Sequence, residues 1–448
     1  MTPDDLRDRF EAAGNELVPA PGSVEAVKSR ARQRTLRNRV TAVLAALLLI
    51  AVVAIGTTFF LSSDTVGDDA NASVADPTVW ASNGLVEAAD FVYVGSFEVP
   101  EDQAGLEEFS FGGSAVAYNP AGEGSLFITG FARNEMVAEI SIPQLRRHEG
   151  ERDGLIQAEV IQPFADITEG RGLSLIGSSE VGGVDDFRIG GLEVIDGVDG
   201  PRLHWTAWQV QNVGFNDVPG HGHSSLDLSS PDVEGPWFLG DFTQYQTSGY
   251  LFDVPDDFAD LVLDGNSAMS GFQLEDFSST SDGPPLFAFS PPSSSPAQER
   301  LDVIELANFE RPEASSSFGE EVIMSGGDWI TTSDNRNAVA LAGNAMRAPN
   351  NLNCRSDAPE QIPSTGPQIA LYDPSDLVEV AAGVRLPSEV EPYEIFSLTG
   401  DVIPVCGEQI SGISYDAENG RLFVVQERAT ENALIFDARP VIHVFSIR

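Results

Sequence analysis

Apolar residues from position 89 onward fall in short runs that often alternate with polar residues. The runs span about five to seven residues and end at Gly, Asn, Asp or Pro, as in 125–130 and 441–447. This pattern is typical of antiparallel strands joined by hairpins. Because no long apolar helical stretch follows residue 63, the pattern predicts an all-β domain over residues 89–448.

The strand pattern repeats along this domain. Five units each open at a pair of small residues, which are Gly112-Gly113, Gly190-Gly191, Ser270-Gly271, Gly326-Gly327 and Ser411-Gly412. Glycines at the start of a strand fit a place where neighbouring backbones crowd together, as at the axis of a propeller. A sandwich is the alternative for a strand-rich chain. The repeat favours a β-propeller-like ring of about five to seven blades, with the strand 91–99 completing the last sheet.

A segment near the N-terminus is long and apolar enough to span a membrane. The run from Val40 to Ser63 contains no charged residue; six basic residues precede it and three aspartates follow it. A helix of ~20 apolar residues crosses the hydrocarbon, and basic residues stay on the cytoplasmic side. A cleaved signal peptide is the alternative, although its apolar core is usually shorter.

This interpretation divides the chain into four parts. We expect a cytoplasmic basic segment (1–39), a transmembrane helix (40–62), a flexible linker (63–88) and an extracytoplasmic β-propeller-like domain (89–448). The protein would then be a single-pass protein of the cell membrane with its N-terminus in the cytoplasm.

The net charge limits the partners of the protein. The chain holds 25 basic and 69 acidic residues, a net charge of −44. Residues 1–39 carry a net charge of +2, so the remainder carries −46. Because an acidic surface repels phosphate backbones and anionic lipids, we expect no nucleic-acid partner.

Cys354 and Cys406 are the two cysteines of the chain. Both follow the predicted span, and an even number of cysteines in an oxidising compartment favours a disulfide. Two distant free thiols are the alternative. A metal site at these cysteines is disfavoured because no histidine lies near them in the sequence.

Two weak patterns suggest a bound cation. His221 and His223 are two residues apart, and Asp241 is a candidate third ligand of a transition metal. Aspartates such as Asp185 and those of 253–260 are ligands that Ca²⁺ prefers, but no twelve-residue calcium-loop pattern is present. Because plain Gly/His and acidic turns explain the same residues, we predict no obligatory cofactor and regard Ca²⁺ as the favoured ion.

Candidate catalytic chemistry is sparse. The chain lacks a nucleophile elbow, a phosphate loop, a dinucleotide fingerprint and a His-Glu-x-x-His motif. Glu193, Asp328 and Trp329 lie on predicted innermost strands, where side chains of different blades meet at the mouth of the channel. Carboxylates there can transfer protons, but polar residues lining a plain ring look the same. The sequence therefore favours a protein without enzymatic activity.

Two resemblances support this organisation. Four segments of the domain, at Tyr93–Phe97, Ile140–Pro143, Leu371–Leu377 and Ile442–Phe445, resemble an uncharacterised family of bacterial exported β-propeller-like proteins. The likeness covers most of 91–448 and implies the fold and export but no catalytic residue. The leader, with Ala20-Pro21-Gly22-Ser23 and an Arg-rich helix before a Leu/Ala/Val span, resembles the leaders of actinobacterial single-pass membrane proteins, which implies the same topology.

Three functions fit this sequence. A binding or scaffold module for a protein, peptide or glycan is favoured, because no catalytic motif is present. A hydrolase or lyase acting at the channel mouth is the alternative, and inward acidic and basic side chains within hydrogen-bond reach would support it. A sensor that relays a signal to a cytoplasmic partner through residues 1–39 is the third hypothesis.

Overall fold

The computed structural model describes the ring-forming part of the chain with gaps. The described residues are 80, 84–101, 109–131, 135–147, 154–176, 187–210, 217–273, 284–308, 322–345, 366–398, 410–427, 429 and 439–448. The predicted transmembrane helix at 40–62 and the predicted disulfide between Cys354 and Cys406 lie outside them. Within the described ranges, none of the helices combines the length and the apolar character that a membrane span needs.

The described strands form five sheets. The first contains β2 (Val116–Asn119), β3 (Ser125–Thr129), β4 (Val137–Ser141) and β5 (Val160–Ala165). The second contains β6 (Phe187–Gly197), β7 (Gly200–Gln209), β8 (His221–Ser224), β9 (Glu234–Leu239) and β13 (Arg300–Leu301). The third contains β10 (Tyr250–Asp253), β11 (Ala268–Gly271), β12 (Leu286–Phe289) and β14 (Val303–Ala307).

Two further sheets and short helices complete this part of the chain. The fourth sheet contains β15 (Val322–Thr331), β16 (Asn337–Ala345), β17 (Pro367–Tyr372) and β18 (Glu394–Ser397). The fifth contains β19 (Ile410–Asp416), β20 (Arg421–Gln426), β21 (Val441–Ile447) and β1 (Phe91–Glu98). The helices are η1 (Ala88–Asp90), η2 (Gly172–Ile176), α4 (Gln244–Thr247), α5 (Asp256–Val262), α6 (Pro374–Ala381) and η3 (Pro387–Glu389).

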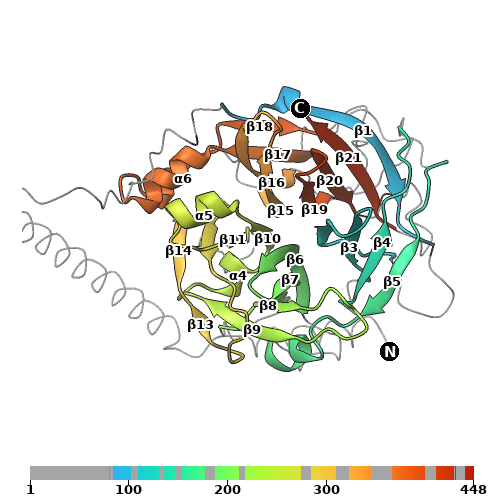
Figure 1. Ribbon diagram of the computed structural model, residues 1–448, viewed down its shortest axis with the longest axis horizontal. Helices are drawn as coiled ribbons and strands as arrows, with labels where there is room; N and C mark the ends of the chain where they lie inside the picture. Colours follow the sequence, from blue (N-terminus) through green and yellow to red (C-terminus); the bar gives the residue numbers. More distant parts are fainter. Residues whose placement is uncertain are drawn as a thin grey trace, which may run out of the picture. The chain divides into compact units, whose positions relative to one another are not determined.

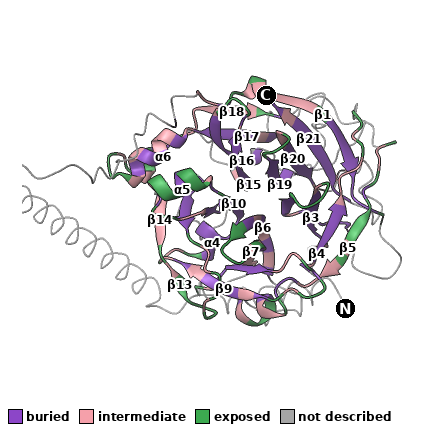
Figure 2. Ribbon diagram, in the orientation of Figure 1, coloured by how far each residue is buried: buried purple, intermediate pink, exposed green. Residues whose placement is uncertain are grey.

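The five sheets are the blades of a propeller (Figure 1). Their innermost strands are β2, β6, β10, β15 and β19, and each contacts the next one around the ring. This confirms the predicted β-propeller, and the blade number lies at the lower end of the predicted range. The five hydrophobic clusters pack mainly between neighbouring sheets, where Figure 2 shows the buried residues.

An early strand and the last strand close the ring. β1 pairs antiparallel with β21, from Phe91 opposite Ile447 to Glu98 opposite Val441, and Figure 1 shows them side by side. Arg336 reinforces this closure, since its guanidinium pairs with Asp90 and donates to the carbonyl of Arg448. The prediction that 91–99 completes the last sheet is therefore confirmed.

One predicted repeat unit was wrong. Ser270-Gly271 does not open an innermost strand, because these residues end β11, the second strand of the third blade. The innermost strand of that blade is β10, which follows Gly249. A connection that contains α5 separates β10 from β11. The first two strands of this blade are therefore farther apart in the sequence than those of the other blades, and the repeat did not predict β10.

The ring has two distinct faces. The first halves of the innermost strands line one pocket. Each strand then runs away from this pocket to a turn that leads into the second strand of its blade. We call the end of the ring that carries these turns the hairpin face. The connections from the second to the third strand of each blade lie at the end of the ring nearer the pocket, which we call the loop face. The turn from Gly197 to Gly200 on the hairpin face is short, whereas β16 ends at Ala345 and β17 begins only at Pro367. Both faces carry long connections, however, because the connection from β17 to β18, which contains α6, lies on the hairpin face.

The chain reaches the ring at the hairpin face. Leu85 forms a bridge with Asn337 at the start of β16, and Val86 is fully buried. Trp80 packs edge-on against Phe258 of α5, with ring centroids 4.9 Å apart. The contacts of the ring thus begin before residue 89, within the segment expected to be linker.

Substitution of an axial glycine tests the predicted crowding. A Cβ at Gly191 would lie 2.6 Å from the carbonyl oxygen of Gly249 and 2.7 Å from the nitrogen of Leu251. Gly191→Ala should therefore lower the free energy of unfolding by about 2 kcal/mol or more, as overpacking does. Gly197→Ala on the same strand is the control, because its Cβ would meet no atom closer than 3.6 Å. Equal stability of both variants in denaturant unfolding would refute axial crowding.

Candidate functional site

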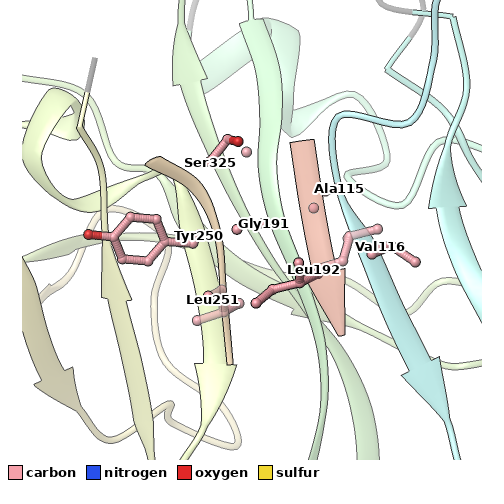
Figure 3. A pocket seen from close by; sticks show the side chains of 12 residues that line it. Ala115, Val116, Gly191, Leu192, Tyr250, Leu251 and Ser325 are labelled. Atoms are coloured by element: carbon pink, nitrogen blue, oxygen red, sulfur yellow. The ribbon is translucent and has the colours of Figure 1, made fainter. Parts of the chain in front are cut away.

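The axis of the ring is narrow. Its pocket is lined by Ala115 and Val116, Gly190 to Leu192, Tyr250 and Leu251, Ser325 to Gly327, and Gly412 and Ile413. Figure 3 shows residues of several blades meeting there, with the hydroxyl of Tyr250 directed away. The free volume is about 10 Å³, on the scale of one water molecule. This axial pocket is too small for an organic substrate.

Polar side chains join neighbouring innermost strands just beyond this pocket. Asp328 of β15 accepts the backbone N–H of Tyr415 on β19, at 2.6 Å. Ser414 of β19 accepts the backbone N–H of Tyr118 on β2, at 2.8 Å. Both acceptors lie two residues after an axial glycine, at Gly326 and Gly412. The side chain at this position of the repeat therefore forms a hydrogen bond to the backbone of the next blade.

Glu193 is the equivalent residue of β6, two positions after Gly191, but its carboxylate makes fewer hydrogen bonds. One carboxylate oxygen accepts the N–H of the adjacent Val194 at 3.2 Å. The other, Oε2, is buried without a hydrogen-bond partner, which costs about 1–3 kcal/mol for a typical buried polar atom. Burial first, then the charges of Asp328 and Asp253, raise the pKa of Glu193 well above its usual value.

Asp328 is also buried, and its pKa is raised well above its usual range. Burial is the main cause, the charge of Asp253 adds to it, and the N–H groups of Tyr415 and Trp329 oppose it. A carboxyl group in such surroundings keeps its proton at a pH where an exposed one has lost it. Glu193 and Asp328 thus form a pair of proton-holding groups next to the axial pocket.

Asp253 completes this acidic group at the end of β10. Its side chain is exposed overall, yet neighbouring protein atoms crowd the carboxylate. Burial, followed by the charge of Asp256, raises the pKa of Asp253 to about 6. The sequence indicated Asp253 only as one of an acidic run, because nothing in that run showed that β10 is an innermost strand.

The structure brings together two of the three residues predicted at the channel mouth. Glu193 and Asp328 lie on the innermost strands β6 and β15 and interact electrostatically. Trp329 is on the same strand as Asp328, but its ring packs 4.6 Å from Phe258 and 6.1 Å from Trp80. It belongs to a buried aromatic cluster rather than to the acidic group.

The three candidate metal ligands do not come together. The His221 Nε2 atom lies 3.0 Å from the Ser270 hydroxyl, and burial lowers the pKa of His221 to about 3. His223 hydrogen-bonds to a backbone carbonyl, and the exposed Asp241 lies 3.8 Å from Arg300. No group of three or more potential ligands suited to a metal occurs among the described residues. Asp185 lies outside them.

A second cluster, which the sequence analysis missed, lies on the loop face. Trp208 at the end of β7 is half-buried, with its ring 5.1 Å from Phe272 and 6.4 Å from Tyr245. Gln244 and Gln273 are buried beside these aromatic residues, and the Nε2 atom of Gln244 and the Oε1 atom of Gln273 lack hydrogen-bond partners. We call these five residues the Trp208 cluster. Only the packing of α4 against β7 and β11 brings them together.

Comparison with known proteins identifies no family. No protein-family model and no curated protein matches the chain. Among solved structures, the chain is similar to a putative exo-beta-1,3-galactanase from Bifidobacterium bifidum s17, with a TM-score of 0.40 and 12% sequence identity over 80% of this chain and 94% of that chain. A likeness of this size assigns no role to any residue.

Replacement of Glu193 tests its raised pKa. The folded state keeps this proton to a higher pH than the unfolded chain, so the free energy of unfolding falls as pH rises above the unfolded pKa of about 4.3. Glu193→Gln removes this dependence, so the free energy of unfolding of the variant should increase relative to that of the wild type as pH rises above about 4.3, by at most ~1.4 kcal/mol per pH unit. Denaturant unfolding at several pH values measures the difference.

The exposed Glu123 in the turn after β2 provides the control. Glu123→Gln should follow the wild-type pH dependence across the same range. If Glu193→Gln also follows it, Glu193 titrates normally in the folded protein.

Proposed function

We propose that this protein is a membrane-anchored binding module that presents the loop face of its propeller to a protein, peptide or glycan. Among the described residues the axial pocket has room for about one water molecule, so we place the ligand at a face of the ring. The loop face carries the half-buried Trp208 and the long connection between β16 and β17, although the hairpin face also carries long connections, as between β17 and β18. Such connections on a rigid scaffold commonly carry binding residues.

The position of the N-terminal segment supports this orientation. The chain enters at the hairpin face, where Leu85 pairs with Asn337 and Trp80 packs on Phe258. A tether attached there leaves the loop face accessible from the other side. The observation that carries the proposal is the combination of a closed axis with a loop face opposite the point of entry.

Footprinting by hydroxyl radicals tests this proposal without knowledge of the ligand. The full-length protein is oxidised alone and with polysaccharide or protein fractions from the envelope of the producing cell. We expect protection of the half-buried Trp208 on the loop face. The exposed Val198 and Leu261 on the hairpin face serve as controls and should stay equally reactive. Protection confined to the hairpin face, or none with any fraction, would contradict the proposal.

A hydrolase is the second candidate, because Glu193 and Asp328 are buried carboxyl groups with raised pKa values. A protonated carboxyl group can act as a general acid. Both side chains are buried, however, with Glu193 8% and Asp328 4% exposed, and Asp328 already accepts two backbone N–H groups. These contacts favour a structural role in joining the blades.

Activity measurements separate the two candidates. Glu193→Gln and Asp328→Asn keep the shapes of the side chains and remove the titrating groups. If the protein hydrolyses a chromogenic glycoside or ester, loss of turnover by about 100-fold or more in these variants would identify an acid–base site and overturn the binding-module proposal. We expect no turnover attributable to these residues, with binding at the loop face retained in both variants.

A further inference from the structure

We infer that the Trp208 cluster on the loop face binds a neutral oligosaccharide. This inference rests on the proposed binding function and names the class of ligand. Its residues come from three elements of neighbouring blades, the end of β7, the short helix α4 and the end of β11.

Trp208 presents an aromatic ring at this face. The chain has five tryptophans, and the other four are at most 8% exposed. Trp208 is half-buried and rests against the buried rings of Phe272 and Tyr245. A partly exposed indole that rests on buried rings offers an apolar surface with a polar edge, which suits the C–H face of a sugar ring.

Two hydrogen bonds hold this surface in place. Gln244 accepts the backbone N–H of Gln209 at 2.6 Å, and the hydroxyl of Tyr245 donates to the carbonyl of Gln209 at 2.7 Å. Both backbone groups of the residue after Trp208 are therefore fixed by α4. A surface held in this way loses little conformational freedom when a ligand binds.

Two buried amides of the cluster each keep one atom without a hydrogen-bond partner, and a ligand reaches these atoms only if the side chains turn outward. Gln244 is 2% exposed and its Nε2 donor is unpartnered, while Gln273 is 7% exposed and its Oε1 acceptor is unpartnered. Buried polar atoms in proteins are nearly always satisfied. A sugar hydroxyl both donates and accepts, so it matches one free donor and one free acceptor better than a purely apolar ligand does.

The charges favour a neutral sugar over an acidic one. Arg188 lies opposite Trp208 in the strand register, but its guanidinium pairs with the buried Glu135 at 3.4 Å. The cluster itself contains no charged side chain, and the chain as a whole carries a net charge of −44. An anionic glycan would meet repulsion from the acidic chain.

Acrylamide quenching of tryptophan fluorescence tests this inference on the full-length protein. The probes are neutral hexasaccharides of glucose, galactose and mannose, a hexamer of galacturonic acid, and a mixture of random-sequence hexapeptides. Because Trp208 is the most exposed of the five tryptophans, a bound sugar should shield the quenchable part of the emission. We expect saturable protection by at least one neutral hexasaccharide and none by the acidic hexamer.

Two isosteric variants of α4 make the test specific. Gln244→Glu keeps the oxygen that accepts from Gln209 and loses the free donor, so it should weaken the binding measured by calorimetry about 10-fold. Gln246→Glu is the matched control, because it makes the same charge change two residues away, where Oε1 accepts the N–H of Thr243. It should bind the sugar like the wild type.

Three results would overturn the inference. They are the absence of protection by every neutral hexasaccharide, equal weakening in the two variants, and protection by the hexapeptides alone. The last result would leave the proposed binding function standing, since Trp208 would still lie in a loop-face site. Footprints restricted to the hairpin face would refute the proposed function itself, so the two failures can be told apart.

Discussion

The close approach of five innermost strands around one axis is the constraint on which the rest of this structure depends. At Gly191 and Gly326 a Cβ atom would lie under 3 Å from the backbone of the next blade, so glycine permits this spacing. The blades then lie near enough for Asp328 and Ser414 to accept N–H groups of the adjacent strand. The same proximity buries carboxyl groups beside one another.

This crowding has a consequence for function. Glu193 and Asp328 are buried between the innermost strands, although their raised pKa values resemble those of catalytic acids. Structural contacts between blades account for the bonds that Asp328 makes. The loop face differs, because the half-buried ring of Trp208 and two buried amides with unpartnered atoms belong to elements that pack together there.

The sequence predicted the fold where local pattern and packing agree. Paired small residues with an axial glycine lie on three innermost strands, whereas Gly112-Gly113 only precedes β2, where Ala115 and Val116 line the axis instead. The prediction failed at Ser270-Gly271, because the inserted α5 breaks the hairpin spacing on which the repeat was read. Glu193 and Asp328 could be predicted at the axis because they follow axial glycines. Trp329 contacts the aromatic cluster instead, because adjacent residues of a strand face opposite sides. The Trp208 cluster could not be predicted, because its members are distant in sequence and meet only through tertiary packing.

A crystal structure of the protein with its ordered waters is the most direct test of the closed axis. We predict a single ordered water, or none, among Gly191, Gly326 and Gly412, with Asp328 bonded to the backbone of Tyr415. A continuous column of water reaching Glu193, or a cavity there of the size of a sugar ring, would contradict the account.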